Sequence, residues 1–372
     1  ILPKVGMGWV RNGVNQMRWR EGKEMDKGDE LLLLIALSGE LPADWIGRSV
    51  GSDSYGAALL TRLKEDGMIK LRKRDGIRGY LLREKGKKYL MEKYQEDVEM
   101  FISGSSCTNH VKSEPSRRLR LHRMCMVWIF CRRAGVKIFC SEKPKLFNLK
   151  WRETSYYGTN EWKLKTDQEI KGSRACGLLI QDKAYVVYNT LDCRMKWQKK
   201  TERNLSARMT IRLRKMANVT LQGAILMGTG EEMIKTLLYS DGGLKGNLFQ
   251  LDDVYEEYYY VPLCSEANLQ FLLLCSREGN ERLKSFLRQG LRQDSQLKGH
   301  LEEGIDRNGK PVYFCYLMGL WKLKRILERP IPKPGRIFCF SYQARELREI
   351  APESFSVEAI LPEKAAQYLG WN

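Results

Sequence analysis

The chain has 372 residues, of which 43% are hydrophobic and 29% charged; these are globular values, and they exclude a disordered or fibrous chain. Its 64 lysines and arginines outnumber 45 acidic residues, so the formal net charge is +19. Such an excess favours polyanionic partners, through phosphate contacts and the release of counterions.

The positive charge is concentrated in three windows. Residues 68–93 contain ten basic and three acidic residues (net +7), residues 112–152 twelve and two (+10), and residues 194–215 nine and one (+8). The remainder of the chain is slightly acidic. We therefore expect basic surfaces where these windows fold.

Cysteine and histidine usage argues against a metal site. The ten cysteines are scattered, mostly in apolar runs, as free cysteines are in a core. Because there is no Cys-x-x-Cys pair and only three histidines, zinc-site spacing is absent, and we expect neither a metal nor a cofactor. Neither an export signal nor a membrane-length apolar run is visible, which predicts a cytoplasmic protein without a membrane partner.

Residues 1–25 combine glycines and basic residues without a sustained period and are interpreted as a basic arm. Residues 26–95 predict a compact unit of three short helices and a hairpin. Ser52 can cap the third helix and Gly67 can end it. The segments MIKLRKR and IRGYLL flank Asp75-Gly76, a pair that favours a two-residue hairpin turn. This order predicts a winged helix-turn-helix domain.

A helix-turn-helix places the start of its third helix in the major groove, and the cations of a wing can neutralise phosphates. Asp53 counts against this interpretation, unless it accepts from a cytosine amino group or simply favours the helix N-terminus. The alternative is a solvated hairpin on a module that binds protein. The predicted DNA-binding residues are Ser52, Ser54, Tyr55 and Arg62 on the third helix and Lys70, Arg72, Lys73, Arg74 and Arg78 on the wing.

Residues 96–116 include the run SGSSCTNHVKSEPS, whose Ser, Gly and Pro residues predict a linker. The next segment, RRLRLHRMCMVWIFCRR at 117–133, has the spacing of a cationic amphipathic helix. Strands and helices then alternate, so we expect one α/β domain over residues 117–290 with a partly parallel sheet. Asn308-Gly309 marks a hairpin in residues 291–372, which we expect to be a β-rich extension packed on that domain.

Two further groups of cations could form a second, weaker DNA surface. One opens the helix at 117–133, and the other lies on a predicted helix from Lys200 to Ala217, after Trp197. A solvated helix face is an equally good interpretation of both. The residues concerned are Arg117, Arg118, Arg120, Lys200, Arg203 and Arg208.

The order of parts over residues 27–280 resembles the replication-relaxation family of plasmid and conjugative-element proteins. The stretches that carry the resemblance are LLLLIALSGELPADWIG, LLTRLKEDGMIKLRKR, GYLLREKGKKYL, LHRMCMVWIFCRRAG and GLLIQDKAYVVYNT. The resemblance implies an N-terminal winged helix followed by an α/β domain related to restriction endonucleases.

A nuclease of that class needs a carboxylate on one strand and Glu-x-Lys or Asp-x-Lys on the next, to hold Mg²⁺ and support the attacking water. Here the two strands offer residues 177–180 (GLLI) and 187–190 (VYNT). Asp182 could act as a lone ligand, but its position beside Lys183 favours an ordinary turn. We therefore expect a degenerate, inactive domain with no catalytic residues.

The leading hypothesis is a non-enzymatic protein of a plasmid or conjugative element that binds double-stranded DNA. It would act in replication, in DNA relaxation or relaxosome assembly, or in transcriptional control, alongside replication or relaxosome proteins, and could form a homodimer on palindromic sites. The alternatives are a metal-dependent nuclease of the same fold and a winged-helix adaptor that binds protein.

Overall fold

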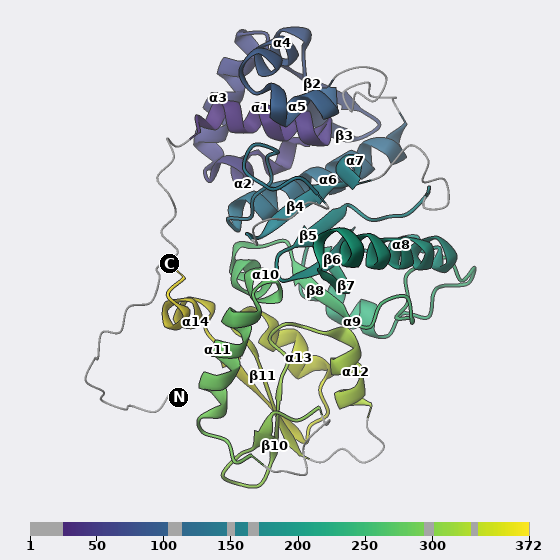
Figure 1. Cartoon of the computed structure of the whole chain (residues 1–372), viewed down its shortest axis with the longest axis vertical. Helices are drawn as coiled ribbons and strands as arrows, with labels where there is room; N and C mark the ends of the chain where they lie inside the picture. Colours follow the sequence, from purple (N-terminus) through teal and green to yellow (C-terminus); the bar gives the residue numbers. More distant parts are fainter. Residues whose placement is uncertain are drawn as a thin grey trace.

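The described residues form a mixed α/β structure with three sheets. Figure 1 shows a helical N-terminal unit at one end of the long axis, a five-stranded sheet in the middle and a four-stranded sheet at the other end. The expected arm over residues 1–25 falls outside the described part of the chain, apart from Met25. A computed structural model describes residues 25–102, 114–146, 153–162, 171–293, 301–328 and 334–371.

The N-terminal unit has the predicted order of three helices and a hairpin. Asp26 caps the first helix by accepting from two backbone N–H groups, and Gly39 ends it in the left-handed conformation. Asp75 and Gly76 have φ values of +52° and +73°, as a two-residue type I′ turn requires. The strands form an antiparallel sheet in the order β1-β3-β2. The elements are α1 (Lys27–Ser38), β1 (Leu41–Pro42), α2 (Ile46–Val50), α3 (Asp53–Glu65), β2 (Ile69–Arg74), β3 (Ile77–Leu82), α4 (Glu84–Lys93) and α5 (Gln95–Ile102).

The expected linker at 96–116 is wrong over its first part. Residues 95–102 form helix α5, and Val98 and Phe101 are buried against α1. Because α4, α5 and a later helix surround α1, every residue of α1 from Gly28 onward is buried. A helix that is apolar on all sides needs such neighbours. Residues 103–113 of the expected linker lie outside the described ranges.

Helix α6 (Pro115–Arg133) joins the N-terminal unit to the central sheet. It was expected to be amphipathic with a cationic face, but from Met124 to Cys131 it is buried on all sides. The reason is that α1 packs on one side while the sheet packs on the other, where the Trp128 and Tyr156 rings meet edge to face at 4.8 Å. One hydrophobic core therefore runs from α1 through α6 to the sheet. No domain boundary separates α6 from the N-terminal unit.

The central sheet has the predicted alternation of strands and helices and is partly parallel. Its order is β4-β5-β6-β7-β8, with antiparallel pairing from β4 to β6 and parallel pairing from β6 to β8. Val187 packs on the α6 face, whereas Val186 and Tyr188 pack on the opposite face under α8. The elements are β4 (Ser155–Gly158), α7 (Thr159–Trp162), β5 (Gly177–Ile180), β6 (Lys183–Leu191), α8 (Lys199–Ala217), β7 (Thr220–Gly228), α9 (Met233–Leu238), β8 (Tyr258–Pro262), α10 (Asn268–Cys275) and α11 (Arg277–Arg288).

The C-terminal part is α/β rather than the expected β-rich extension, because a helix follows each of its three parallel strands. The hairpin around Asn308 and Gly309 is present between β9 and β10, and the sheet order is β12-β11-β10-β9. The backbone N–H of Tyr260 donates to Met318 O, which ties this part to β8. The elements are β9 (Gly304–Ile305), β10 (Pro311–Phe314), α12 (Leu320–Leu327), β11 (Gly335–Phe340), α13 (Ala344–Ile350), β12 (Phe355–Ile360) and α14 (Pro362–Leu369). Across the described ranges, no helix combines the length and apolar character needed to cross a bilayer.

Candidate nucleic-acid interface

Helix α3 presents polar side chains at its start. The Ser52 hydroxyl accepts from the backbone N–H of Tyr55 at 3.4 Å, so the predicted cap is present. Ser54 lies 3.1 Å from the Ser52 hydroxyl, and both serines are exposed. Tyr55 is 46% exposed although it is aromatic, and Arg62 is exposed two turns later. The predicted contact residues of α3 therefore share an accessible surface.

Close packing between α2 and α3 depends on glycine. A Cβ atom at Gly56 would lie 2.7 Å from Ile46 Cγ2, so no larger residue fits without moving α2. Asp53 occupies the first turn of α3 and is exposed. A carboxylate is favourable at that end of the helix, because it complements the helix dipole. This local role accounts for Asp53 without any base contact.

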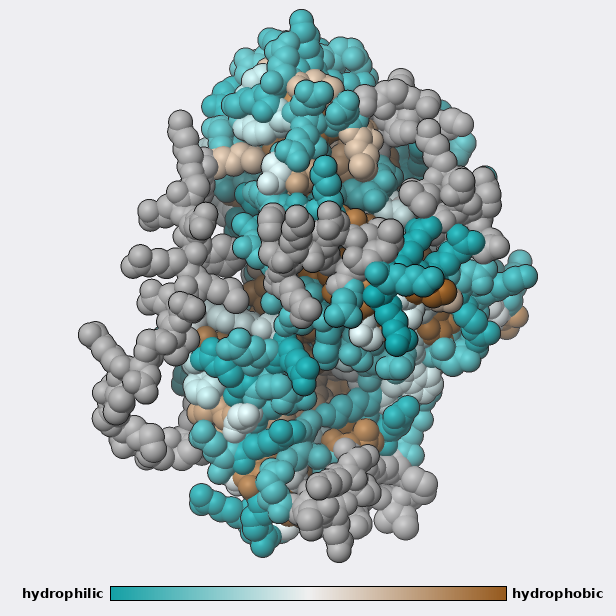
Figure 2. Space-filling model, in the orientation of Figure 1, coloured by the Kyte–Doolittle hydropathy of each residue, from teal (hydrophilic) through white to brown (hydrophobic). Residues whose placement is uncertain are grey.

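The β2–β3 hairpin carries four exposed cations, Lys70, Lys73, Arg74 and Arg78. In the described ranges, Lys70, Lys73 and Arg78 are exposed and have no carboxylate partner. Arg74 lies 3.5 Å from Asp75, but both side chains are largely exposed, so the pair is weak. Arg72 is half-buried and already interacts within the chain. Figure 2 shows that the visible surface of this unit is mostly hydrophilic.

A buried ionic cluster fixes the hairpin against α6. Arg118 and Glu40 have fully buried side chains, and Arg118 Nε donates to Glu40 Oε2 at 3.0 Å. Arg118 also donates to two hairpin carbonyls, Arg74 O at 2.9 Å and Ile77 O at 3.2 Å. The prediction that Arg118 binds DNA is wrong, because its guanidinium is buried and hydrogen-bonded to Glu40 and to the hairpin carbonyls. We call Glu40, Arg118 and His122 the Glu40 cluster.

The Glu40 cluster is tightly enclosed. His122 Nε2 lies 3.1 Å from Glu40 Oε1. Burial by itself would raise the pKa of Glu40, but His122 and Arg118 outweigh it and hold that pKa below its ordinary value. Gly79 on β3 leaves room for the carboxylate, since a Cβ there would lie 2.3 Å from Glu40 Oε1. Sequence reasoning missed this cluster; the only hint was that Glu40 lies between the apolar run at 31–37 and Leu41.

The remaining cations of the expected second surface do not form one surface. Arg117 is exposed and Arg120 half-buried at the start of α6, whereas Lys200 is exposed on α8. Arg203 bonds Asp253 at 2.9 Å, and Arg208 already interacts within the chain. Helices α6 and α8 pack on opposite faces of the central sheet, although Glu202 in the first turn of α8 acts electrostatically on Arg120.

The strands that would carry nuclease residues lie side by side. Strands β5 and β6 are antiparallel neighbours, with Gly177 opposite Val187. Within the described part of the chain, no group of three or more His, Cys, Asp or Glu side chains could hold a metal ion. Asp182 lies in the tight turn between these strands, where the Gln181 N–H donates to Lys183 O at 3.0 Å. This agrees with the interpretation of Asp182 as a turn residue.

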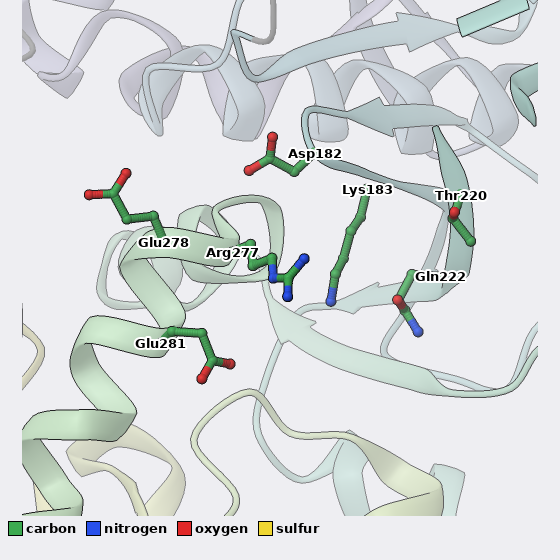
Figure 3. Close-up of a pocket in the computed structure, with 7 residues that line it drawn as sticks. All are labelled: Asp182, Lys183, Thr220, Gln222, Arg277, Glu278 and Glu281. Carbon is green, nitrogen blue, oxygen red and sulfur yellow. The ribbon is translucent and has the colours of Figure 1, made fainter. Parts of the chain in front are cut away.

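A polar pocket of about 540 Å³ lies beside this turn, between the start of β7 and α11. Figure 3 shows Lys183 and Arg277 extending toward the same space. Burial, helped by Lys284 and Arg277, lowers the pKa of Lys183. Three carboxylates line the same pocket against two cations, so its lining has a net charge of −1 and does not favour anions. They belong to Asp182, Glu278 and Glu281.

Comparison of the chain with known protein families, characterised proteins and solved structures finds no match.

Proposed function

We propose that residues 26–102 form a winged helix-turn-helix module that binds double-stranded DNA. In this proposal the start of α3 enters the major groove, and the β2–β3 hairpin is the wing that contacts phosphates. One observation carries it: the hairpin exposes Lys70, Lys73 and Arg78 without carboxylate partners, in the same unit as a helix whose polar N-terminal residues are exposed.

The proposed role is that of a non-enzymatic DNA-binding protein of a plasmid or conjugative element. The support for this role is the resemblance in the order of parts. The α/β part is proposed to be a degenerate restriction-endonuclease-like domain that acts as a binding platform. Its support is the mixed sheet, with α6 before it and α8 crossing from β6 to β7, and the apolar residues on β5 where an active enzyme needs a carboxylate.

Selection of bound duplexes from a random pool, followed by titration of the recovered site, tests the proposal. We expect a recurring motif, which is palindromic if the protein binds as a homodimer. The triple variant Lys70→Ala/Lys73→Ala/Arg78→Ala should bind every duplex more weakly. The slope of the logarithm of the binding constant against the logarithm of the salt concentration should become shallower by about 2.7, at about 0.9 for each of the three lost phosphate contacts.

The matched control removes three exposed cations from the C-terminal part, and so changes net charge equally. It should retain wild-type affinity and slope. If the two triple variants lose the same affinity and the same salt slope, the net charge of the protein alone explains the binding, and the hairpin is not a DNA-binding wing. A protein that selects no duplex at all would favour the adaptor alternative. The control residues are Arg307, Lys310 and Lys364.

A further inference from the structure

The first turns of α6 hold a concentration of arginines that helix stability does not explain. Arg117, Arg118 and Arg120 fall in these turns, and no acidic residue occurs in the first turn. Cations at a helix N-terminus oppose the helix dipole and are unfavourable there. Glu114 precedes the helix, but its side chain makes no capping hydrogen bond. Functional sites are where a protein is expected to break such a local rule, here the preference for acidic residues at a helix N-terminus.

Arg118 serves the Glu40 cluster, which leaves Arg117 and Arg120 one turn apart on the helix surface. Arg174, just before β5, joins them. Cys176 N donates to Val187 O on β6 at 2.7 Å, and Asn189 on the same strand donates to Arg123 O at 3.0 Å, so the segment before β5 lies beside the first turns of α6. Burial foremost, and then the positive charges of Arg174 and Arg117, lower the pKa of Arg120, while Cys176 and Glu202 act in the opposite direction. In the described ranges, none of the three arginines has a carboxylate bonded to its side chain.

Glu202, in the first turn of α8, is a buried carboxylate that already accepts three hydrogen bonds. Glu202 accepts from the Ser173 hydroxyl at 2.9 Å, from the Arg174 backbone N–H at 2.9 Å and from the Tyr188 hydroxyl at 2.8 Å. These bonds hold the segment before β5 in place but leave the Arg174 side chain exposed. On the next turn of α6, Arg123 Nε is buried with no hydrogen-bond partner.

We propose that Arg117, Arg120 and Arg174 form a second phosphate-binding surface, which receives the backbone of the same duplex beside the wing. This inference rests on the proposed function. Its placement follows from Arg118, which donates to Arg74 O and Ile77 O at the hairpin turn and so holds the start of α6 at the tip of the wing. A guanidinium matches phosphate geometry, and three of them in one place suit a run of backbone phosphates.

Titration of one long duplex at several salt concentrations tests this surface. The variant Arg117→Ala/Arg120→Ala/Arg174→Ala should lower the log–log salt slope by about 2.7, so the affinity ratio between wild type and variant narrows about 40-fold from 50 to 200 mM salt. Combined with the wing variant, the slope losses should add. The matched control is again Arg307→Ala/Lys310→Ala/Lys364→Ala, which should change nothing.

The outcomes separate this inference from the proposed function. If the wing variant loses slope and the arginine variant does not, the second surface is wrong while the wing stands. If the wing variant loses nothing, the proposed function fails first. The wild type and the arginine variant are also titrated with inorganic phosphate. If the arginine variant loses phosphate binding but keeps the wild-type salt slope for the duplex, the three arginines bind a phosphate ligand other than DNA, and the inference is overturned. The arginine variant should melt no lower than wild type, because it removes like-charge repulsion; a lower melting temperature would indicate a structural role.

Discussion

Replacing Arg118 by methionine tests whether the Glu40 cluster holds the N-terminal unit to the rest of the protein. The substitution leaves the fully buried Glu40 carboxylate without its arginine, with His122 still beside it, and removes the donor to the hairpin carbonyls of Arg74 and Ile77. Breaking one partner of a buried ion pair costs about 3–5 kcal/mol, and the lost carbonyl contacts place Arg118→Met toward the upper end. The free energy of unfolding, measured by urea denaturation followed by circular dichroism, reports the loss.

Two companion variants make this result interpretable. Arg117→Met changes the neighbouring exposed arginine and should shift the free energy of unfolding by no more than about 0.5 kcal/mol. Glu40→Gln/Arg118→Met removes both charges and should recover a large part of the loss, because no buried charge is then left unpaired. If Arg118→Met destabilises no more than Arg117→Met does, the cluster does not stabilise the protein and our reasoning is wrong.

The cluster also predicts a pH dependence. The pKa of Glu40 is lower in the folded protein than its ordinary value of 4.5. Its contribution to stability is therefore complete above the unfolded-state pKa and is lost as pH falls through the lower folded-state pKa. Wild-type stability should decline with acidification below pH 4.5, and the Glu40→Gln/Arg118→Met variant should decline less steeply. Parallel pH profiles for the two proteins would contradict this assignment.

Further predictions concern single positions. Gly79→Ala places a Cβ 2.3 Å from Glu40 Oε1, and this overpacking should lower the free energy of unfolding in urea by about 1–3 kcal/mol. The control Gly76→Ala cannot overpack, because no atom lies within 4 Å of its Cβ; it measures only the cost of a positive φ. Tyr55→Ala should reduce preference for the selected site over random duplex while leaving the salt slope unchanged; a changed slope would mean that Tyr55 contacts phosphate. Asp29→Asn should lower the free energy of unfolding by about 2 kcal/mol at pH 7. Burial alone would raise the pKa of Asp29, but the hydrogen bonds from Lys93, Tyr94 and Tyr89 outweigh it and lower that pKa. The loss of stability should therefore shrink as pH falls below 3.8, and a loss that does not depend on pH would contradict this account. Supercoiled plasmid incubated with the protein and Mg²⁺ or Mn²⁺ should stay intact, whereas nicking that disappears in Asp182→Ala would revive the nuclease alternative.

Local sequence was sufficient wherever a short segment specifies its own conformation. Ser52 caps α3 because its hydroxyl reaches a backbone N–H three residues away, and Asp75-Gly76 forms the turn because both residues tolerate positive φ. The alternation of strands and helices from β5 to β8 was predicted in the same way, since it depends on runs of apolar residues along the chain. These features do not depend on what packs against them.

Tertiary packing decided which cations remain available. Arg117 and Arg118 are adjacent, identical residues at the start of one helix, and sequence alone assigns them the same role. In the structure Arg117 faces solvent while Arg118 is buried against Glu40, 78 residues earlier in the chain. Arg174 was absent from the predicted surface because it comes near the start of α6 only when β6 joins the two segments, through Cys176 N to Val187 O and Asn189 Nδ2 to Arg123 O.

The sequence by itself determined a mixed α/β protein with an N-terminal unit of three helices and a basic hairpin. Only the tertiary structure determined that α6 is buried on all sides from Met124 to Cys131 rather than amphipathic along its length, and that α5 packs on α1 where the start of a linker was expected. The physical reason is that charge and periodicity describe what a segment can bury or expose. Which of these it does depends on neighbours that are distant in the chain, here α1 on one side of α6 and the central sheet on the other.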